Sequence, residues 1–342
     1  MHGSKLPFAL LDPPPYFYRF DRNPALHPIA GCEEKDMEGF ILLPLLAATV
    51  QAGTPILYAT LGEMLTERAG VLNLGVEGMM LVGALAAFWT SLTTGSPWLG
   101  LIAGGTAAAL LSSIHAVICL LFQGNQVVSG LALTIFGTGL ADFWGTPYIG
   151  QKAEGFSTLK VPFLAEIPVL GRIFFQQDLL VYISLLLPLL LWLFLTRTRW
   201  GLGLRSVGEY PRAAVAAGLP VLRYRAAGIL AGGFCVGLGG AYLSLAYTHI
   251  WTNGLTAGRG WIAVALVIFA FWRPERAILG AYLFGGVMAF QLRLQAMGTD
   301  LPSSLLLMLP YLLTIIVLAL TSWKGRFTDA PGSLGANIEP EE

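Results

Sequence analysis

The sequence has few charged residues for its length. Of its 342 residues only 12% are Asp, Glu, Lys or Arg, whereas a soluble globular domain has about 25%. The stretches 98–122, 179–195, 226–247 and 303–323 contain none of the four. This deficit excludes an ordinary soluble domain. Because about 20 apolar helical residues cross a bilayer core, it predicts a chain that crosses the membrane several times.

Motifs that would carry chemistry are also missing. Cys32, Cys119 and Cys235 are widely separated and show neither metal-ligand spacing nor a disulfide framework. The chain lacks the G-x-x-x-x-G-K-[ST], H-E-x-x-H and G-x-S-x-G motifs. Its net charge is zero, which gives no indication of a nucleic-acid partner. We therefore expect no enzyme, no metal site and no cofactor bound by this chain.

The expected fold is an all-α polytopic membrane bundle, since a helix satisfies its own backbone hydrogen bonds in lipid. The 41 glycines fit this expectation, because small residues let membrane helices approach closely. Nine segments are predicted to be membrane helices: 40–62, 70–92, 98–122, 126–149, 179–197, 225–247, 260–273, 277–297 and 303–323. The seventh and eighth are short and divided by "WRPER". They are either broken helices near a transport site or ordinary helices joined by a tight turn.

The chain divides into three parts by composition. Residues 1–36 are rich in proline and aromatic residues, and we expect a disordered tail or an extension that a start at Met37 would omit. Residues 37–325 form the expected membrane domain, and 326–342 a polar C-terminal tail. Two long connections, 150–178 and 198–224, interrupt the membrane domain.

Arginine distribution predicts the orientation. The segment 196–225 has six arginines against one acidic residue, Glu209, whereas charges in 150–178 are balanced. The positive-inside rule therefore places 196–225 in the cytoplasm, and counting spans places the C-terminus there too. The first span then enters from outside, which the absence of one earlier helix would explain.

Asn73 and Glu77 are polar residues within an apolar stretch. Their i, i+4 spacing predicts that they lie on one face of a helix, and the flanking Gly70, Gly75 and Gly78 could make that helix locally irregular. A carboxylate at membrane depth costs several kcal/mol unless it is paired or hydrated. Glu77 therefore either lines a polar path or hydrogen-bonds the free amides of a broken helix without meeting substrate.

Other polar residues occur singly in or beside the apolar segments. Gln51 could join helices or contact a ligand, and Asn125 and Gln126 open the segment 126–149, where helix capping is the simpler explanation. His115 is expected to be a hydrogen-bonded core residue. Asp142 is expected to be interfacial, near the outer end of its segment.

The arginine-rich connection contains a short helix of its own. Pro211 suits a first helical position, the alanine-rich run to Ala217 continues the helix, and Gly218 with Pro220 ends it. A small alanine-faced helix between two spans is typical of an element that docks into a groove on a partner.

Three motifs resemble a known family. They are "GTPILYATLGEMLTERAGVLNLGVEGMMLVGA", "NQVVSGLAL" and "GLRSVGEYPRAAVAAGLPVLRYR" followed by "GLGGAYLSL". Over residues 40–325 the chain resembles the membrane permease subunits of bacterial ABC importers, in the branch that includes ribose and branched-chain amino acid permeases. Within that branch "ERAGVLNLGVEGMM" is most similar to the nucleoside importer permeases.

The resemblance implies partners and a coupling site. The chain would lie in the bacterial inner membrane and form a heterodimer with a sister permease. A separate ATP-binding subunit would bind and hydrolyse ATP. An extracytoplasmic binding protein would deliver the cargo. The positions that match the coupling-loop pattern, where the ATPase would dock, are Gly208, Glu209, Ala213, Ala214 and Gly218.

The leading hypothesis is thus a permease that imports nucleosides or related neutral sugars by alternating access. The candidate pathway residues are Gln51, Asn73, Glu77, Asn125 and Gln126. Two alternatives remain: the same machinery with simple sugars, purine bases or branched-chain amino acids as cargo, or a secondary transporter that couples to protons through Glu77 or Asp142.

Overall fold

The computed structural model describes residues 34–299, 301–323 and 329–336. The chain separates into two units, Met1–Gly39 and Phe40–Glu342, and the following concerns the second. The expected tail 1–36 lies almost wholly outside the described residues, and residues 34–36 belong to the first helix.

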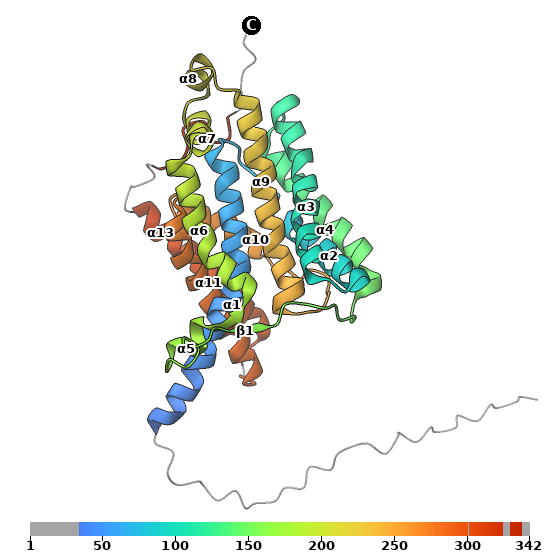
Figure 1. The fold of residues 1–342 in the computed structure, drawn as a ribbon, viewed down its shortest axis with the longest axis vertical. Coiled ribbons are helices and arrows are strands. Elements are labelled where there is room, and N and C mark those ends of the chain that lie inside the picture. The colour runs from blue at the N-terminus through green and yellow to red at the C-terminus, as the bar shows by residue number, and fades with distance from the viewer. Residues whose placement is uncertain (1–33, 300, 324–328, 337–342) are drawn as a thin grey trace, which may run out of the picture. The chain divides into compact units, whose positions relative to one another are not determined.

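The described part is almost entirely helical (Figure 1). Its first half contains α1 (Glu34–Arg68), α2 (Val76–Thr94), α3 (Pro97–Ala116), α4 (Gln126–Gly145), β1 (Thr158–Lys160), α5 (Leu170–Phe174) and β2 (Gln176–Asp178). Its second half contains α6 (Leu179–Arg197), α7 (Arg199–Glu209), α8 (Pro211–Ala216), α9 (Val221–Tyr242), α10 (Arg259–Phe269), α11 (Pro274–Ala296), α12 (Ser303–Leu307) and α13 (Leu309–Trp323). Turns of π-helix extend α3 over Val117–Leu121 and α9 over Leu243–Tyr247.

Seven helices in the described residues are long and apolar enough to cross a membrane, and α10 and the α12–α13 region are shorter apolar helices. The predicted polytopic helical bundle is confirmed. The segment 260–273 corresponds to α10, whose 11 residues span roughly 16 Å at 1.5 Å per residue. It crosses only about half of a bilayer core of about 30 Å. A tight turn through Phe271 and Trp272, both with positive φ, then leads into α11, so the predicted tight turn is present beside a helix that is short for a membrane span.

Glycines allow the central helices α2, α3 and α9 to pack closely. A Cβ on Gly83 of α2 would lie 2.7 Å from the Gly237 Cα of α9, and one on Gly104 of α3 would lie 2.7 Å from the Gly83 carbonyl oxygen. No side chain fits at such distances, so these crossings require glycine. The glycine-rich composition therefore serves helix packing, as the sequence predicted.

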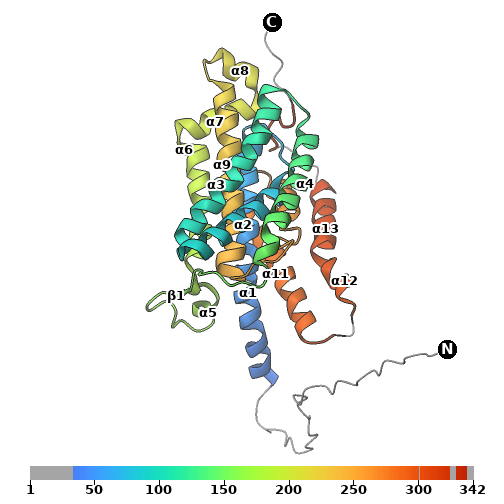
Figure 2. The ribbon, with the colours of Figure 1, turned by 90° about the vertical axis from the view of Figure 1, so that its right-hand side faces the viewer.

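Two ends of the bundle differ in their connections, as both ribbon views show (Figures 1 and 2). The α8 end is the end at which α7 and α8 connect α6 to α9. The hairpin end contains β1 and β2, which pair antiparallel with Thr158 opposite Asp178. The Asp178 side chain caps α6 by accepting from the Val181 amide at 3.1 Å, so the hairpin is fixed to the start of a spanning helix.

The connection 198–224 contains two helices rather than the single one expected. The predicted short helix is present as α8, but α7 precedes it and was missed. Thr198 caps α7 by accepting from the Gly201 amide at 3.0 Å. The glycines at 201 and 203 and the arginines made this stretch read as an extended loop, yet the glycines lie where α7 packs against α6 and α9.

Candidate functional site

The stretch around Asn73 is a break between two helices rather than one continuous helix. α1 ends at Arg68 and α2 begins at Val76, so the prediction that Asn73 and Glu77 share one helix face is wrong. Gly70 has a φ of 85°, a conformation that glycine adopts without strain. The Asn73 Oδ1 atom accepts from the Gly75 amide at 2.9 Å, so Asn73 shapes the turn that starts α2.

Side chains from α3 and α4 satisfy the backbone at the centre of this break. The Leu72 amide donates to Gln126 Oε1 at 2.8 Å, and the Leu72 carbonyl oxygen lies 3.1 Å from His115 Nε2. The other ring nitrogen of His115 lies 2.9 Å from Ser129 Oγ. His115 is fully buried and hydrogen-bonded, as expected from the sequence.

Further backbone groups of the break bond to α1 and α4. The Asn73 amide donates to Glu63 Oε1 at 3.1 Å, and the Leu74 carbonyl accepts from Thr134 Oγ1 at 2.8 Å. Irregular backbone is tolerated within a membrane only where such partners replace water. The side chains that supply them are 10 and 60 residues away in sequence, so the break is a built feature of the fold.

Glu77 joins this region to a second helix break, the non-helical segment 248–258 before α10. One carboxylate oxygen accepts from Thr256 Oγ1 at 2.5 Å and from the Gly258 amide at 2.9 Å, and the other accepts from the Gly260 amide at 2.7 Å. The carboxyl group therefore caps the start of α10, where the helix dipole favours an acidic side chain. This geometry matches the second of the two sequence readings, a bond to the free amides of a broken helix.

Arg259, the first residue of α10, was missed by sequence reasoning. It is 7% exposed, and its Nη1 atom donates to the Thr256 carbonyl at 3.0 Å. Its guanidinium lies 5.8 Å from the Tyr247 ring centroid, within the range of a cation–π interaction. A lone arginine between two glycines is typical of a loop. Its position just before an apolar run was the one feature of the sequence that indicated a helix start near the membrane.

The remaining candidate pathway residues lie at the two ends. Gln51 donates to Gln177 Oε1 at 3.0 Å and so connects α1 to the hairpin. Asn125 caps α4 by accepting from the Val128 amide at 3.0 Å, which is the helix-capping role that the sequence analysis favoured for it. The structure thus brings Asn73 and Gln126 together around one break and Glu77 to the other, and leaves Gln51 apart.

Residues 45–318 match the model for the permease component of the branched-chain amino acid transport system. The chain belongs to this permease family.

Relatives of the permease cover most of its length. A Haloferax volcanii protein provisionally named a glucose ABC transporter permease is 47% identical over 261 residues, 75% of this chain and 79% of its own length. A guanosine ABC transporter permease protein of Bacillus subtilis is 36% identical over 311 residues, covering 86% and 96% of the two chains. A nucleoside ABC transporter permease protein of Lactococcus lactis subsp. cremoris is 37% identical over 296 residues, covering 82% and 92%. No solved structure matches the permease.

The candidate coupling residues of the permease all lie at its α8 end. Gly208 and Glu209 end α7, and Ala213 and Ala214 lie in α8. Ala214 is buried against Val207 and Val221, whereas Ala213 is exposed. Gly218 has a φ of 76° and ends α8, in the left-handed conformation typical of a helix C-terminus.

Part of the expected C-terminal tail packs against this end of the permease. Ser333 is 7% exposed, and both its amide and its hydroxyl donate to the Gly208 carbonyl, at 3.0 and 2.6 Å. Arg225 donates to Ser333 Oγ at 3.0 Å and to the Ala336 carbonyl at 3.2 Å, and Gln126 donates to the same carbonyl. The segment 329–336 therefore connects α7, α9 and α4.

The start of the same segment contacts α1 and the α10–α11 turn. Arg273 forms an ion pair with Asp329 at 2.8 Å, and Arg68 donates to the Asp329 carbonyl at 3.2 Å. Arg68 also donates twice to the Trp272 carbonyl, and the Trp272 indole donates to Glu67. These contacts join the end of α1, the end of α10 and the C-terminal segment into one polar cluster.

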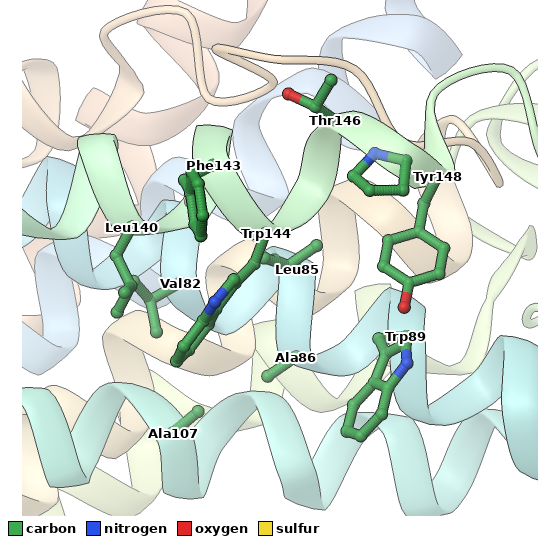
Figure 3. Close-up of a pocket in the computed structure, with 12 residues that line it drawn as sticks. Val82, Leu85, Ala86, Trp89, Ala107, Leu140, Phe143, Trp144, Thr146 and Tyr148 are labelled. Atoms are coloured by element: carbon green, nitrogen blue, oxygen red, sulfur yellow. The ribbon is translucent and has the colours of Figure 1, made fainter.

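A large pocket of about 970 Å³ opens between α2, α3 and the end of α4. Figure 3 shows Trp144 directed toward Ala107 and the Tyr148 hydroxyl directed toward Trp89. The lining is almost wholly apolar, and its Thr146 hydroxyl already donates to the Asp142 carbonyl at 2.6 Å. Such a surface suits apolar neighbours more than a polar cargo, and its tryptophans are typical of a membrane interface.

Proposed function

We propose that this permease forms part of an ABC importer that moves nucleosides or related neutral sugars inward. The observation that carries the proposal is its similarity, over more than four-fifths of the chain, to permeases named for guanosine and nucleosides. The relative named for glucose supports sugars as part of the class. Nucleosides and hexoses share a neutral, hydroxyl-rich sugar, so one pathway with few charges could pass both.

The ATPase partner would dock at the α8 end. α8 is short, capped and largely exposed, which suits insertion into a groove on another chain. In this assignment Ala214 anchors α8 to the permease, Ala213 faces the ATPase, and Gly208, Glu209 and Gly218 set the angle of α8. ATP would be bound and hydrolysed by that partner, because this chain lacks the phosphate-loop motif.

The other proposed partners are a sister permease, an extracytoplasmic binding protein and the lipid bilayer. Two different guanosine ABC transporter permease proteins of Bacillus subtilis are similar to this chain, which supports a pair of unlike permeases. The arginine-rich segment 196–225 supports a cytoplasmic α8 end and an inner-membrane location. The hairpin end would then receive the binding protein.

Glu77, Asn73 and Gln126 would act by holding the two helix breaks in place. α10 packs against α2, α11 and α13, and its start depends on the Glu77 carboxylate. Alternating access requires elements that move as rigid bodies around a site, and broken helices are typical of such sites. The breaks would therefore border the pathway, with Gln51 and Asn125 fixing the two ends of the bundle.

The test is uptake of radiolabelled guanosine and glucose into vesicles that contain this permease, its sister permease, the ATPase and the binding protein. We expect uptake with ATP and none with a non-hydrolysable analogue, with competition by nucleosides or sugars but not by leucine or free purine bases. Competition by leucine or by free purine bases would show that the cargo is a branched-chain amino acid or a purine base instead. Uptake that ignores ATP and collapses with the proton gradient would overturn the importer and favour the proton-coupled alternative.

A further inference from the structure

The buried arginine at the start of α10 is not explained by the helix cap. Glu77 alone accepts from the backbone amides of Gly258 and Gly260 at the start of α10. Arg259 uses Nη1 for the Thr256 carbonyl and, at 3.5 Å, for the Leu255 carbonyl. Its Nε atom is fully buried and finds no acceptor among the described residues. Burying a guanidinium is energetically costly. The Nε–H donor of Arg259 nevertheless bonds to no acceptor in the part of the chain that the structure describes.

Arg259 begins α10, at the opposite end of that helix from the Trp272 turn. The end of α10 is fixed near the α8 end by the contacts of Trp272 with Arg68. A helix of 11 residues extends roughly 16 Å, so α10 directed along the membrane normal from a cytoplasmic α8 end would place Arg259 about half-way across a bilayer core of about 30 Å. An ionisable side chain at this depth marks a substrate or ion pathway more often than a structural contact.

Two tyrosines flank the guanidinium. Tyr247, at the end of the π-helical extension of α9, has its ring 5.8 Å from the guanidinium, and the hydroxyl of Tyr311 on α13 lies against Gly258, the residue before Arg259. The Tyr311 hydroxyl lies 3.5 Å from the Ala257 carbonyl. Both Tyr311 and Ala257 are exposed on the surface of the chain, so a cargo moving along that surface would reach the cluster directly.

We propose that Arg259, flanked by Tyr247 and Tyr311, is the membrane-depth contact for the sugar hydroxyls of the cargo. This inference rests on the proposed function and specifies which part of the cargo the pathway recognises. A guanidinium offers several N–H donors and no acceptor, which suits hydroxyl oxygens. Tyrosine adds a ring face that packs against a sugar or base and a hydroxyl that both donates and accepts.

A purely structural alternative exists for the same residue. Arg259 and Glu77 both bond to Thr256, Arg259 to its carbonyl and Glu77 to its hydroxyl, so Arg259 could serve only to offset the buried carboxylate. Removing one partner of a buried charge pair is destabilising, whereas removing both is often neutral. The two explanations therefore differ in what a double variant does.

The experiment uses the complete transporter in vesicles, with wild type, R259Q, R259K, E77Q and E77Q/R259Q. Each is assayed for initial uptake of guanosine against 2′-deoxyguanosine, and of glucose against 2-deoxyglucose. We expect wild type to prefer the fully hydroxylated cargo and R259Q to lose that preference on the order of tenfold, the loss for one hydrogen bond to a charged group. E77Q/R259Q should show the same lost preference and should melt closer to wild type than R259Q does.

The decisive quantity is the ratio of the initial uptake rates of the hydroxylated cargo and its deoxy analogue, because a change in packing alone would lower both rates together. R259K keeps the charge beside Glu77 but not the guanidinium fork, so it supplies this ratio if R259Q does not assemble. An unchanged ratio in either variant, or full recovery of uptake in E77Q/R259Q, would overturn the inference while leaving the proposed function intact. A wild-type transporter that takes up neither cargo with ATP would overturn both.

Discussion

Replacing Glu77 by alanine tests how much the carboxylate contributes to the position of α10. The substitution leaves the amides of Gly258 and Gly260 without their acceptor, whereas the Thr256 hydroxyl can rotate to another one. A buried unsatisfied donor costs about 1–3 kcal/mol, so two amides cost about 2–6 kcal/mol. Glu77→Gln keeps one acceptor oxygen and should cost about half as much.

The assay is thermal unfolding of the purified permease in detergent, combined with uptake in vesicles. A change of 1 kcal/mol shifts the midpoint by roughly 2–4 °C in domains of 150–250 residues and by less in longer chains. We expect the midpoint to fall in the order wild type, Glu77→Gln, Glu77→Ala, and uptake to fall in the same order while the ATPase still binds.

Glu166→Ala is the matched control, because Glu166 is an exposed carboxylate in the connection 161–169. Exposed substitutions usually change stability by less than about 0.5 kcal/mol. If Glu77→Ala melted together with the control, the carboxylate would not hold α10 and the reasoning would be refuted.

Four further predictions concern the ends of the bundle. Gly218→Val places a β-branched residue at a φ of 76° at a cost of about 1–2 kcal/mol; it should weaken ATPase co-purification and uncouple uptake, with a fall of only a few °C in the midpoint. Glu209→Arg should also uncouple uptake, and normal uptake in both variants would count against docking at α8. Ser333→Ala removes one donor to Gly208 and one of the two acceptors of Arg225, so uptake per ATP hydrolysed should fall, with partial recovery in Ser333→Thr. Gln51→Ala releases Gln177 and should speed proteolysis of the hairpin connection, which unchanged cleavage would contradict.

The spans could be predicted from sequence because each depends on a local quantity, the length of an apolar run. In the described residues, seven of the nine predicted segments correspond to helices long and apolar enough to cross a membrane, whereas 260–273 and 303–323 correspond to shorter apolar helices. The α8 helix was also predictable, because Pro211 and Gly218 act on their own helix ends.

The start of α2 was mispredicted because its cause is not local. An apolar, glycine-containing stretch from Gly70 onward would continue as a helix if nothing else could satisfy its backbone. Gln126, His115 and Thr134 satisfy it instead, and their proximity depends on how α3 and α4 pack. The sequence therefore identifies Asn73, Glu77 and Gln126 as polar residues in or beside apolar segments, but the arrangement that joins them could not be inferred from it.

Arg259 and the C-terminal segment escaped prediction for a related reason. Each looks like a solvated residue or tail when its neighbours in sequence are the only context. Their partners, Tyr247 for Arg259 and Gly208 for Ser333, lie 12 and 125 residues away. The apolar surroundings of Asn73 and Glu77 thus identified them as unusual in a membrane segment. The contacts of Arg259 and Ser333 follow only from tertiary packing.

The segment 329–336 has a consequence for the order of synthesis. These residues follow every described helix, yet they supply the partners of Arg225, Gly208 and Arg273 at the α8 end. During translation all the described helices leave the ribosome before these contacts can form. The face proposed to meet the ATPase is therefore completed last, so a nascent permease with an unfinished bundle presents an incomplete surface to that partner.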